Sequence, residues 1–330
     1  MTFRALLTER SDSGEVATRL TQFDDSDLMP GDVDIAVSWS GINYKDALAV
    51  TGTGQIMRRF PLVGGIDLAG TVTASRHPGV AVGDVVLGVG HELGQTHHGG
   101  FAEQARVPGE WLLPVPAPLT ARDAMIIGTA GFTAALSVLA LERGGLTPDR
   151  GDVVVTGASG GVGSFAVALL VARGYRVVAS TSRVHDPDRL LAIGAAELLD
   201  RRQLSEPGRP FQSIRWAGAV DTVGSHTLAN VLAATGFGGV VTCCGLAQGN
   251  DLPGSVLPFI LRGVTLAGID SVHVADELRR QAWARLASDL DRATLERTTD
   301  SQVGLADVVE ASRRLLAGGV QGRIVVDVTA

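Results

Sequence analysis

Short runs of apolar and alternating residues, separated by Gly and Pro, dominate the first third of the chain. They predict strands at 33–39, 70–74, 85–87 and 101–107. Several short strands with this punctuation are typical of a small barrel or sandwich. Pro114, Pro116 and Pro118 then form an extended connector, because proline fixes its own φ and disfavours helix in the residue before it. The pattern places a domain boundary near residue 120.

After residue 150 the pattern changes, and apolar strand-like runs alternate with segments of helical length. It predicts strands at 152–156, 176–180, 219–222, 239–244 and 264–268, and helices at 162–172, 186–193, 225–234 and 276–290. Strands that alternate with helices of this length form βαβ crossovers and a parallel sheet. We therefore predict a doubly wound α/β domain here. A last strand at 322–328 fits either domain on this pattern alone.

The stretch 124–141 has no charge and is long enough to cross a bilayer. However, it contains Gly128, Thr129 and Ser137, and it leads directly into the strand and glycine pattern of the second domain. We therefore expect a buried helix. No apolar stretch of signal-peptide length precedes the first charges of the chain, so we expect no export.

Composition excludes several function classes. The net charge of −7 argues against a broad cationic face for nucleic acid or anionic lipid. The only cysteines, Cys243 and Cys244, are adjacent and cannot link distant segments. We therefore expect a reducing compartment, the cytoplasm. The 42 glycines, without any collagen period, indicate many tight turns and close backbone approaches.

A glycine loop gives the first chemical signal. Residues 157–163 read Gly-Ala-Ser-Gly-Gly-Val-Gly, directly after one predicted strand and before an apolar helix. In this setting small residues let backbone N–H groups approach a pyrophosphate, and the helix N-terminus adds partial positive charge. The loop predicts dinucleotide binding, and the alternative is a tight turn without a ligand.

The end of the next strand indicates which dinucleotide is bound. An Asp or Glu there would hold the ribose 2′-hydroxyl of NAD. This chain has Thr181, Ser182 and Arg183 instead, which offer two hydroxyls and a guanidinium to a 2′-phosphate. We therefore expect NADPH. The alternative for Arg183 is a solvated surface side chain.

Metal and hydrolase sites have little support. Zinc needs three or four converging ligands, and adjacent cysteines in a strand point to opposite faces. His91, His97 and His98, with Glu92, are the only plausible metal group, and we expect their loop to be solvated or to line the substrate. No Gly-x-Ser-x-Gly elbow follows a strand. We therefore predict no metal and no hydrolase triad.

The segment Asn43-Tyr44-Lys45-Asp46 places an amide, a phenol, a cation and a carboxylate side by side. A neutral phenol donates a hydrogen bond or a proton at pH 7. Such a group suits reduction of an activated double bond, in which hydride adds to the β-carbon while charge grows on the carbonyl oxygen. The alternative is a turn whose Asn and Asp bond their own backbone while Tyr44 packs.

Seven segments spread over nearly the whole chain are more specific together than the glycine loop alone. They are residues 41–48, 65–72, 128–134, 157–163, 243–249, 257–263 and 268–271. With them the chain resembles the zinc-independent medium-chain dehydrogenase/reductases, and among these the acrylyl-coenzyme A reductases, long labelled quinone oxidoreductase-like.

The resemblance implies a GroES-like β-barrel catalytic domain over residues 1–120, completed by 299–330, and a Rossmann NADPH-binding domain over 121–298. It implies reduction of acrylyl-CoA to propanoyl-CoA and, from pairing of the edge strand at 264–268, a homodimer. Asn43 stands where zinc-dependent relatives have Cys, and Ile66-Asp67 where they have His-Glu, which implies a metal-free site. The implied cofactor contacts are Tyr44 at the nicotinamide, Ser159, Gly160, Gly161 and Val162 at the pyrophosphate, Thr181, Ser182 and Arg183 at the 2′-phosphate, and Arg201, Leu246, Ile260 and Ser271 elsewhere.

Two departures from the family pattern bear on specificity. His91 and His98 stand where tryptophans are usual, and Gln95 where Glu is usual, in a loop that we expect to border the substrate. An asparagine expected at or near Gly318 is missing, which removes one cofactor contact.

We thus predict an NADPH-dependent reductase of a small α,β-unsaturated acyl-CoA, with Tyr44, Asn43 and Asp46 as the catalytic group. One alternative is a reductase of quinones, enals or enones. The other is a non-catalytic NADPH-binding regulatory or RNA-binding protein. The net charge disfavours RNA, and the 43–46 segment favours chemistry.

Overall fold

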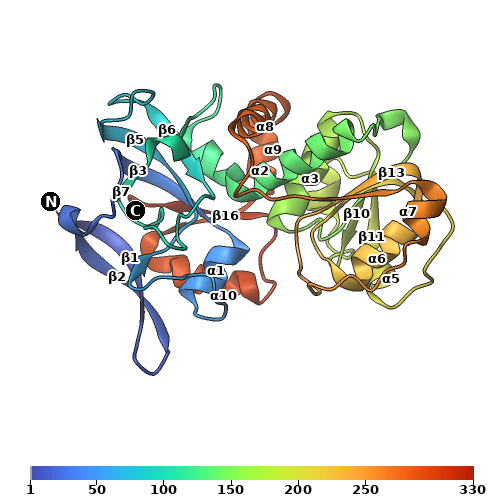
Figure 1. The fold of residues 1–330 in the computed structure, drawn as a ribbon, viewed down its shortest axis with the longest axis horizontal. Coiled ribbons are helices and arrows are strands. Elements are labelled where there is room, and N and C mark those ends of the chain that lie inside the picture. The colour runs from blue at the N-terminus through green and yellow to red at the C-terminus, as the bar shows by residue number, and fades with distance from the viewer. Residues whose placement is uncertain (1) are drawn as a thin grey trace. The chain divides into compact units, whose positions relative to one another are not determined.

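The computed structural model describes residues 2–330 and divides into two compact units (Figure 1). The first unit contains the chain up to Thr129 together with Thr299–Ala330, and the second contains Ala130–Thr298. The C-terminal segment thus returns to the unit in which the chain begins.

A seven-stranded sheet forms the larger part of the first unit, in the order β15-β16-β3-β5-β6-β8, with β7 paired to β3. Its strands are β3 (Val33–Ile42), β5 (Asp67–Ser75), β6 (Val85–Val89), β7 (Gln104–Val107), β8 (Leu113–Pro114), β15 (Thr299–Gly304) and β16 (Arg323–Asp327). The pairs are antiparallel, apart from the parallel pair β15–β16. The four strands expected in this region are present, although β7 begins at Gln104 rather than Phe101.

A second sheet of the first unit has the order β2-β1-β4. Its strands are β1 (Thr2–Arg10), β2 (Val16–Asp24) and β4 (Leu62–Val63). The hydrophobic pattern does not predict the β1–β2 hairpin, because Phe23 is the only buried residue of β2 and the strand has no continuous apolar face. This hairpin lines the cavity described below.

The last strand, which the sequence left unplaced, belongs to the first unit. β16 pairs with β3 in antiparallel register, so that Ile324 lies opposite Ile42. This register brings Arg323 beside the end of β3, where the predicted catalytic segment begins.

Two helices of the first unit, α1 (Tyr44–Val50) and α10 (Val308–Leu316), contact each other. Both contribute to one apolar core with β1, β3 and β16, which includes Leu6, Ile42, Ala47, Val308 and Ile324. Apolar packing against this core therefore holds α1 in place. Short 3₁₀ turns lie at Asp25–Asp27, Gly109–Trp111, Pro148–Arg150 and Leu305–Asp307.

The uncharged stretch lies in α2 (Ala121–Arg143). The helix is interrupted at Gly128, whose φ of 49° and ψ of −159° are not helical. By length and composition α2 could cross a membrane, but 89% of its apolar window is buried inside the structure. The expectation of a buried helix is confirmed.

The second unit contains a parallel six-stranded sheet in the order β11-β10-β9-β12-β13-β14. Its strands are β9 (Val153–Val155), β10 (Val177–Thr181), β11 (Glu197–Asp200), β12 (Trp216–Asp221), β13 (Thr235–Cys243) and β14 (Thr265–Gly268). The five predicted strands are present. The sequence pattern missed β11, because this short strand carries a charge at each end and only Leu199 is buried.

Seven further helices of the second unit form two groups. They are α3 (Gly161–Ala172), α4 (Asp188–Ile193), α5 (Arg202–Ser205), α6 (Ser225–Ala233), α7 (Leu257–Arg262), α8 (Asp276–Asp289) and α9 (Arg292–Thr298). α3 contacts α4, α8 and α9, whereas α6 contacts α5 and α7 (Figure 1). Two helix layers on a parallel sheet are the doubly wound arrangement expected from the sequence.

Candidate active site

Tyr44 is the first residue of α1, and 56% of it is exposed. Its hydroxyl has no hydrogen-bond partner among residues 2–330. The chain has one other tyrosine, Tyr175, which is buried and donates from its hydroxyl to the Leu146 carbonyl at 2.8 Å. Tyr175 is therefore a packing residue, as expected, and Tyr44 is the phenol available for chemistry.

Asp46 closes the first turn of α1 behind Tyr44. Its Oδ2 accepts hydrogen bonds from the Asn43 backbone N–H at 2.9 Å and from the Asn43 side-chain amide at 3.0 Å. Its Oδ1 accepts from the Ile66 N–H at 2.8 Å. The carboxylate is fully buried and ties the start of the helix to the residue before β5.

A second buried carboxylate, Asp67, lies against the same amide. Asp67 accepts from the Asn43 amide at 2.8 Å, and from the Thr129 hydroxyl at 2.6 Å and backbone N–H at 2.9 Å. The Arg323 guanidinium lies 3.4 Å from Asp67 Oδ2 and donates to Asn43 Oδ1 at 2.9 Å. Asn43 therefore connects both carboxylates with the cation, and all four side chains are buried.

Arg323 is also fixed by the backbone. It donates to the carbonyl of Ile126 at 3.0 Å and to that of Ile42 at 3.0 Å. Burial lowers the pKa of Arg323, and the charges of Asp67 and Asp46 oppose this effect. The guanidinium thus supplies the positive charge that a pair of buried carboxylates needs.

Burial raises the pKa of Asp46 to about 7, and the charge of Asp67 adds to this rise. The hydrogen bonds from Asn43 and Ile66 act in the opposite direction because they stabilise the carboxylate. Asp46 is therefore a buried carboxyl that titrates near neutral pH, directly behind the exposed phenol.

This cluster does not fit a zinc ion. The amide of Asn43 and the carboxylate of Asp67 are occupied by hydrogen bonds, and the Arg323 guanidinium contacts both. The backbone of Gly128 packs directly against the same two side chains. A Cβ at this position would clash with Asp67 Oδ2 and would lie 2.6 Å from Arg323 Nη2. Within the described part of the chain, no group of three or more His, Cys, Asp and Glu side chains could hold a metal ion.

The histidines of the 90–100 loop pack against aromatic rings. His91 stacks on Trp111 at 5.4 Å between ring centroids, and His97 meets the edge of the same ring at 5.2 Å. His98 lies edge-on to Phe23 at 5.2 Å. Burial, followed by the neighbouring His97, lowers the pKa of His98 to about 4. These rings form a packed layer rather than a converging metal group.

In the second unit the glycine loop connects β9 to α3 as predicted. Gly157 has a φ of +59°, which only glycine adopts readily, and a Cβ on Gly163 would clash with the Gly157 carbonyl. Gly160 is the N-cap of α3, and no side chain of the described residues caps the helix there. Backbone N–H groups at this turn are therefore available to a pyrophosphate.

The predicted 2′-phosphate group lies at the carboxyl end of β10. The Thr181 hydroxyl donates to the Ser159 hydroxyl at 3.2 Å, and accepts from the Arg183 backbone N–H at 3.0 Å. Ser182 is exposed and Arg183 is partly buried. The backbone N–H of the exposed Arg201 donates to the Thr181 carbonyl at 3.0 Å. Five of the predicted residues, Ser159, Thr181, Ser182, Arg183 and Arg201, thus lie at one strand end.

A carboxylate beside this strand end is held by a cation of its own. Asp200 lies beside Thr181 in the sheet register and accepts from Arg202 Nε at 2.8 Å. The hydrogen bonds from Arg202 lower the pKa of Asp200 to about 2. Its charge is therefore compensated, and it repels a phosphate less than a free carboxylate would.

The remaining predicted cofactor residues are more scattered. Leu246 lines a cavity with Gly268 and Asp270 at the carboxyl ends of β13 and β14, next to the partly buried Ser271. Ile260 is exposed on α7 and is not among the residues that line this cavity. The structure does not bring Ile260 into that group.

Sequence reasoning missed Arg323, and it considered Asp67 only as a replaced zinc ligand. A charge at the start of the apolar run 323–326 is a weak signal, because exposed strand ends often carry one. Only the pairing of β16 with β3 shows that this charge is buried.

Family models match both units. Residues 29–117 match the alcohol dehydrogenase GroES-like domain, and residues 161–288 match a family described as zinc-binding dehydrogenase. The second description does not agree with the side chains found here, which offer no zinc site among residues 2–330.

The chain is 44% identical over 330 residues to the acrylyl-CoA reductase AcuI of Ruegeria pomeroyi, covering 99% of this chain and all of the relative. It is 49% identical over 325 residues to AcuI of Escherichia coli, provisionally named an acrylyl-CoA reductase, covering 98% of this chain and 99% of the relative. The chain belongs to the medium-chain dehydrogenase/reductase family, in its acrylyl-CoA reductase and quinone oxidoreductase-like branch. In the same branch, YhfP of Bacillus subtilis, provisionally named a quinone oxidoreductase, is 44% identical over 98% of both chains.

Crystal structures of this branch have the same fold. The YhdH oxidoreductase of Salmonella enterica, solved in complex with NADP, superimposes with a TM-score of 0.96 at 48% identity, covering 99% of this chain and 100% of that one. YhfP of Bacillus subtilis, solved with NAD bound, gives a TM-score of 0.96 at 44% identity, covering 99% and 100%. This medium-chain dehydrogenase/reductase therefore has a GroES-like unit and a Rossmann unit, as the sequence predicts.

Proposed function

We propose that this medium-chain reductase uses NADPH to reduce the C=C bond of a small α,β-unsaturated acyl-CoA, acrylyl-CoA to propanoyl-CoA. The observation that carries the proposal is the end-to-end identity with two AcuI proteins at 44% and 49%. The exposed Tyr44 phenol and the glycine loop supply the two kinds of group that this reaction needs.

When bound, NADPH supplies the hydride that adds to the β-carbon, while a proton adds to the α-carbon and NADP⁺ is left. Tyr44 is the proposed proton donor, or the hydrogen-bond donor to the carbonyl oxygen on which charge develops. A water molecule is the alternative proton source, with Tyr44 then contacting only the nicotinamide. Asn43 and Asp46 hold Tyr44 in place through the capped first turn of α1.

For the cofactor we propose contacts from the glycine loop between β9 and α3 and from the carboxyl end of β10. The residues are Ser159, Gly160, Gly161 and Val162 at the pyrophosphate, Thr181, Ser182 and Arg183 at the 2′-phosphate, and Tyr44, Arg201, Leu246 and Ser271 along the remainder. The compensated charge of Asp200 supports NADPH over NADH. The complex of Salmonella YhdH with NADP agrees with this choice, whereas YhfP was solved with NAD.

The proposal is tested by following NADPH absorbance at 340 nm with acrylyl-CoA, a free enone and a quinone as acceptors. We expect the highest kcat/KM with acrylyl-CoA and propanoyl-CoA as the product by mass spectrometry. A preference for the quinone would support the second function, which the similarity to YhfP favours. No oxidation with any acceptor would overturn both and leave a non-catalytic NADPH-binding protein.

We also propose a homodimer formed at β14. This strand is the edge of the six-stranded sheet, and a free edge is a site for strand pairing. Exposed apolar side chains lie in the segment between β13 and β14, at Leu246, Leu252, Val256, Ile260 and Leu261. Such a patch favours association.

A cytoplasmic location is proposed because neither cysteine forms a disulfide.

A further inference from the structure

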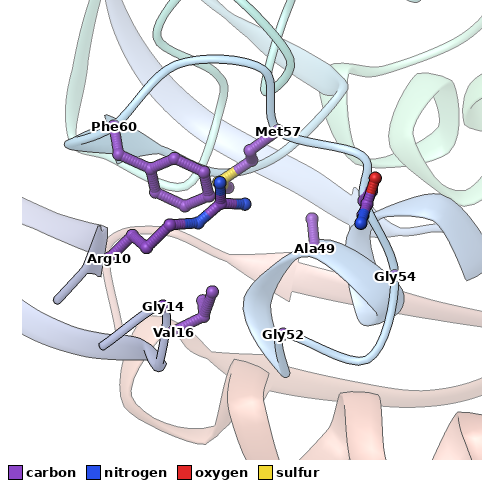
Figure 2. A pocket seen from close by; sticks show the side chains of 9 residues that line it. Arg10, Gly14, Val16, Ala49, Gly52, Gly54, Met57 and Phe60 are labelled. Carbon is purple, nitrogen blue, oxygen red and sulfur yellow. The ribbon is translucent and has the colours of Figure 1, made fainter. Parts of the chain in front are cut away.

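A cavity of about 280 Å³ opens in the first unit between the β1–β2 hairpin and the loop that follows α1 (Figure 2). Its apolar lining comes from Val16, Ala49, Met57 and Phe60. Arg10 and Gln55 add polar groups, and three glycines complete the wall. None of these residues takes part in the Tyr44 cluster.

The backbone holds the two walls of the cavity close together. The Thr18 hydroxyl of β2 donates to the Val50 carbonyl, the last residue of α1, at 2.7 Å. Gly52 has a φ of +70°, and a Cβ there would lie 2.8 Å from the Val16 Cβ. The hairpin therefore approaches the loop so closely that only a glycine fits at position 52.

Arg10 gives this cavity a charge. Its guanidinium carbon lies 4.1 Å from the centroid of the Phe60 ring. Figure 2 shows the Arg10 side chain extending toward this ring. No carboxylate pairs with it in the described chain. By contrast, Arg19 on the same hairpin is paired with Glu9 at 2.9 Å.

The other charged residues of the hairpin turn and of the loop lie outside the cavity lining. Arg58 and Arg59 are exposed in the same loop and form no ion pair within residues 2–330. The carboxylates of the hairpin turn, Asp12 and Glu15, do not line the cavity. Arg10 is therefore the one charged residue that lines the cavity, and in a chain with a net charge of −7 it gives this apolar pocket a positive charge.

We infer that this cavity binds the 3′-phosphorylated ADP end of coenzyme A, an inference that rests on the proposed acyl-CoA substrate. The apolar lining and Phe60 fit a planar base, and Arg10 fits a phosphate through paired hydrogen bonds. Ala49 in the cavity wall and Tyr44 lie on the same helix, about 7 Å apart along its axis. The pantetheine arm of coenzyme A is longer than this helix. It therefore spans from a nucleotide in the cavity at Ala49 to an acyl group at Tyr44.

The first test compares KM for acrylyl-CoA with KM for the acrylyl thioester of N-acetylcysteamine, which lacks the nucleotide. Arg10→Ala should raise the KM for acrylyl-CoA, divided by the KM for the N-acetylcysteamine thioester, roughly ten- to hundredfold. Only the full substrate loses a charge-assisted contact in this variant. Arg19→Ala removes the same charge from the same hairpin and should leave the ratio unchanged. An equal effect of Arg10→Ala on both thioesters would overturn the inference.

The second test does not depend on turnover. Calorimetry measures binding of adenosine 3′,5′-bisphosphate to protein saturated with NADP⁺, so that the dinucleotide site is filled. We expect binding to the unmodified protein and to Arg19→Ala, and a loss of tenfold or more for Arg10→Ala and Phe60→Leu. Unchanged binding in both cavity variants would refute the cavity assignment. If acrylyl-CoA is not reduced at all, the proposed function fails while this titration still decides the binding site.

Discussion

Arg323 on β16 donates to Asn43 Oδ1 at 2.9 Å, across 280 residues of sequence. Asn43 is the residue before Tyr44, so the C-terminal return of the chain holds the segment that carries the phenol. The same guanidinium is the only cation that pairs with Asp67 in the described structure. Arg323 therefore has two roles. It compensates the charge of Asp67, and through Asn43 it holds the start of α1 in place.

The first prediction concerns this cation. Arg323→Met should lower the free energy of unfolding by about 3–5 kcal/mol, because it leaves buried carboxylates without a counter-charge. Urea unfolding at pH 7 measures the loss. Arg313→Met is the matched control, since Arg313 is exposed on α10 and pairs only with the exposed Glu310. Equal losses for the two variants would show that the buried charge contributes nothing.

The raised pKa of Asp46 predicts a pH dependence of stability. The folded protein holds a proton on Asp46 up to about pH 7, whereas the unfolded chain releases it near the usual aspartate pKa of 3.8. Between these values the folded state binds more protons, so this contribution to stability is complete below about pH 4 and is lost as the pH rises to 7. The slope is at most about 1.4 kcal/mol per pH unit.

Asp46→Asn removes the titrating group and provides the comparison. The unfolding free energy of the unmodified protein minus that of the variant should decrease from pH 4 to pH 7, and urea titrations at several pH values measure it. A difference that stays constant over this range, or that grows with pH, would contradict the raised pKa.

The local parts of the site could be predicted from sequence, but the long-range parts could not. The glycine loop and Tyr44 each depend on a few neighbouring residues whose spacing fixes a strand, a turn and a helix start. Arg323 acquires its role only through the register of β16 on β3. The cavity around Arg10 likewise depends on the hairpin strand β2, which lacks a continuous apolar face. Side-chain contacts such as His91 on Trp111 also require the folded chain.

Arg183 should determine the choice of cofactor. Arg183→Ala is expected to weaken NADPH binding roughly ten- to hundredfold, because a charge-assisted contact to the 2′-phosphate is lost. NADH lacks this phosphate, so its affinity should be nearly unchanged. Fluorescence titration with both cofactors measures the effect. The control is Arg176→Ala, which removes an exposed arginine at the other end of β10, where it pairs with Asp152. Equal loss for NADPH and NADH would refute the assignment.

Tyr44→Phe tests the phenol. If its hydroxyl donates in the reaction, kcat for acrylyl-CoA at saturating NADPH should fall about 10²- to 10⁴-fold. Stability should not change, because the hydroxyl bonds to no described residue. Tyr175→Phe is the matched control and should do the opposite. It removes the bond to Leu146, costs about 1 kcal/mol of stability and leaves kcat intact. Unchanged turnover in Tyr44→Phe would assign the proton to water.

The last prediction concerns association through the edge strand. Leu261 is exposed on α7, which directly precedes β14, and a buried carboxylate there would be strongly unfavourable in a dimer. We expect the unmodified protein to sediment as a dimer at micromolar concentration and the Leu261→Glu variant to sediment as a monomer. The variant subunit should still be folded and should unfold at the same temperature as the unmodified subunit. Val82→Glu places the same charge on another exposed apolar residue, in the first unit, and should remain dimeric. A monomeric unmodified protein, or a Leu261→Glu variant that still dimerises, would show that β14 is not the interface.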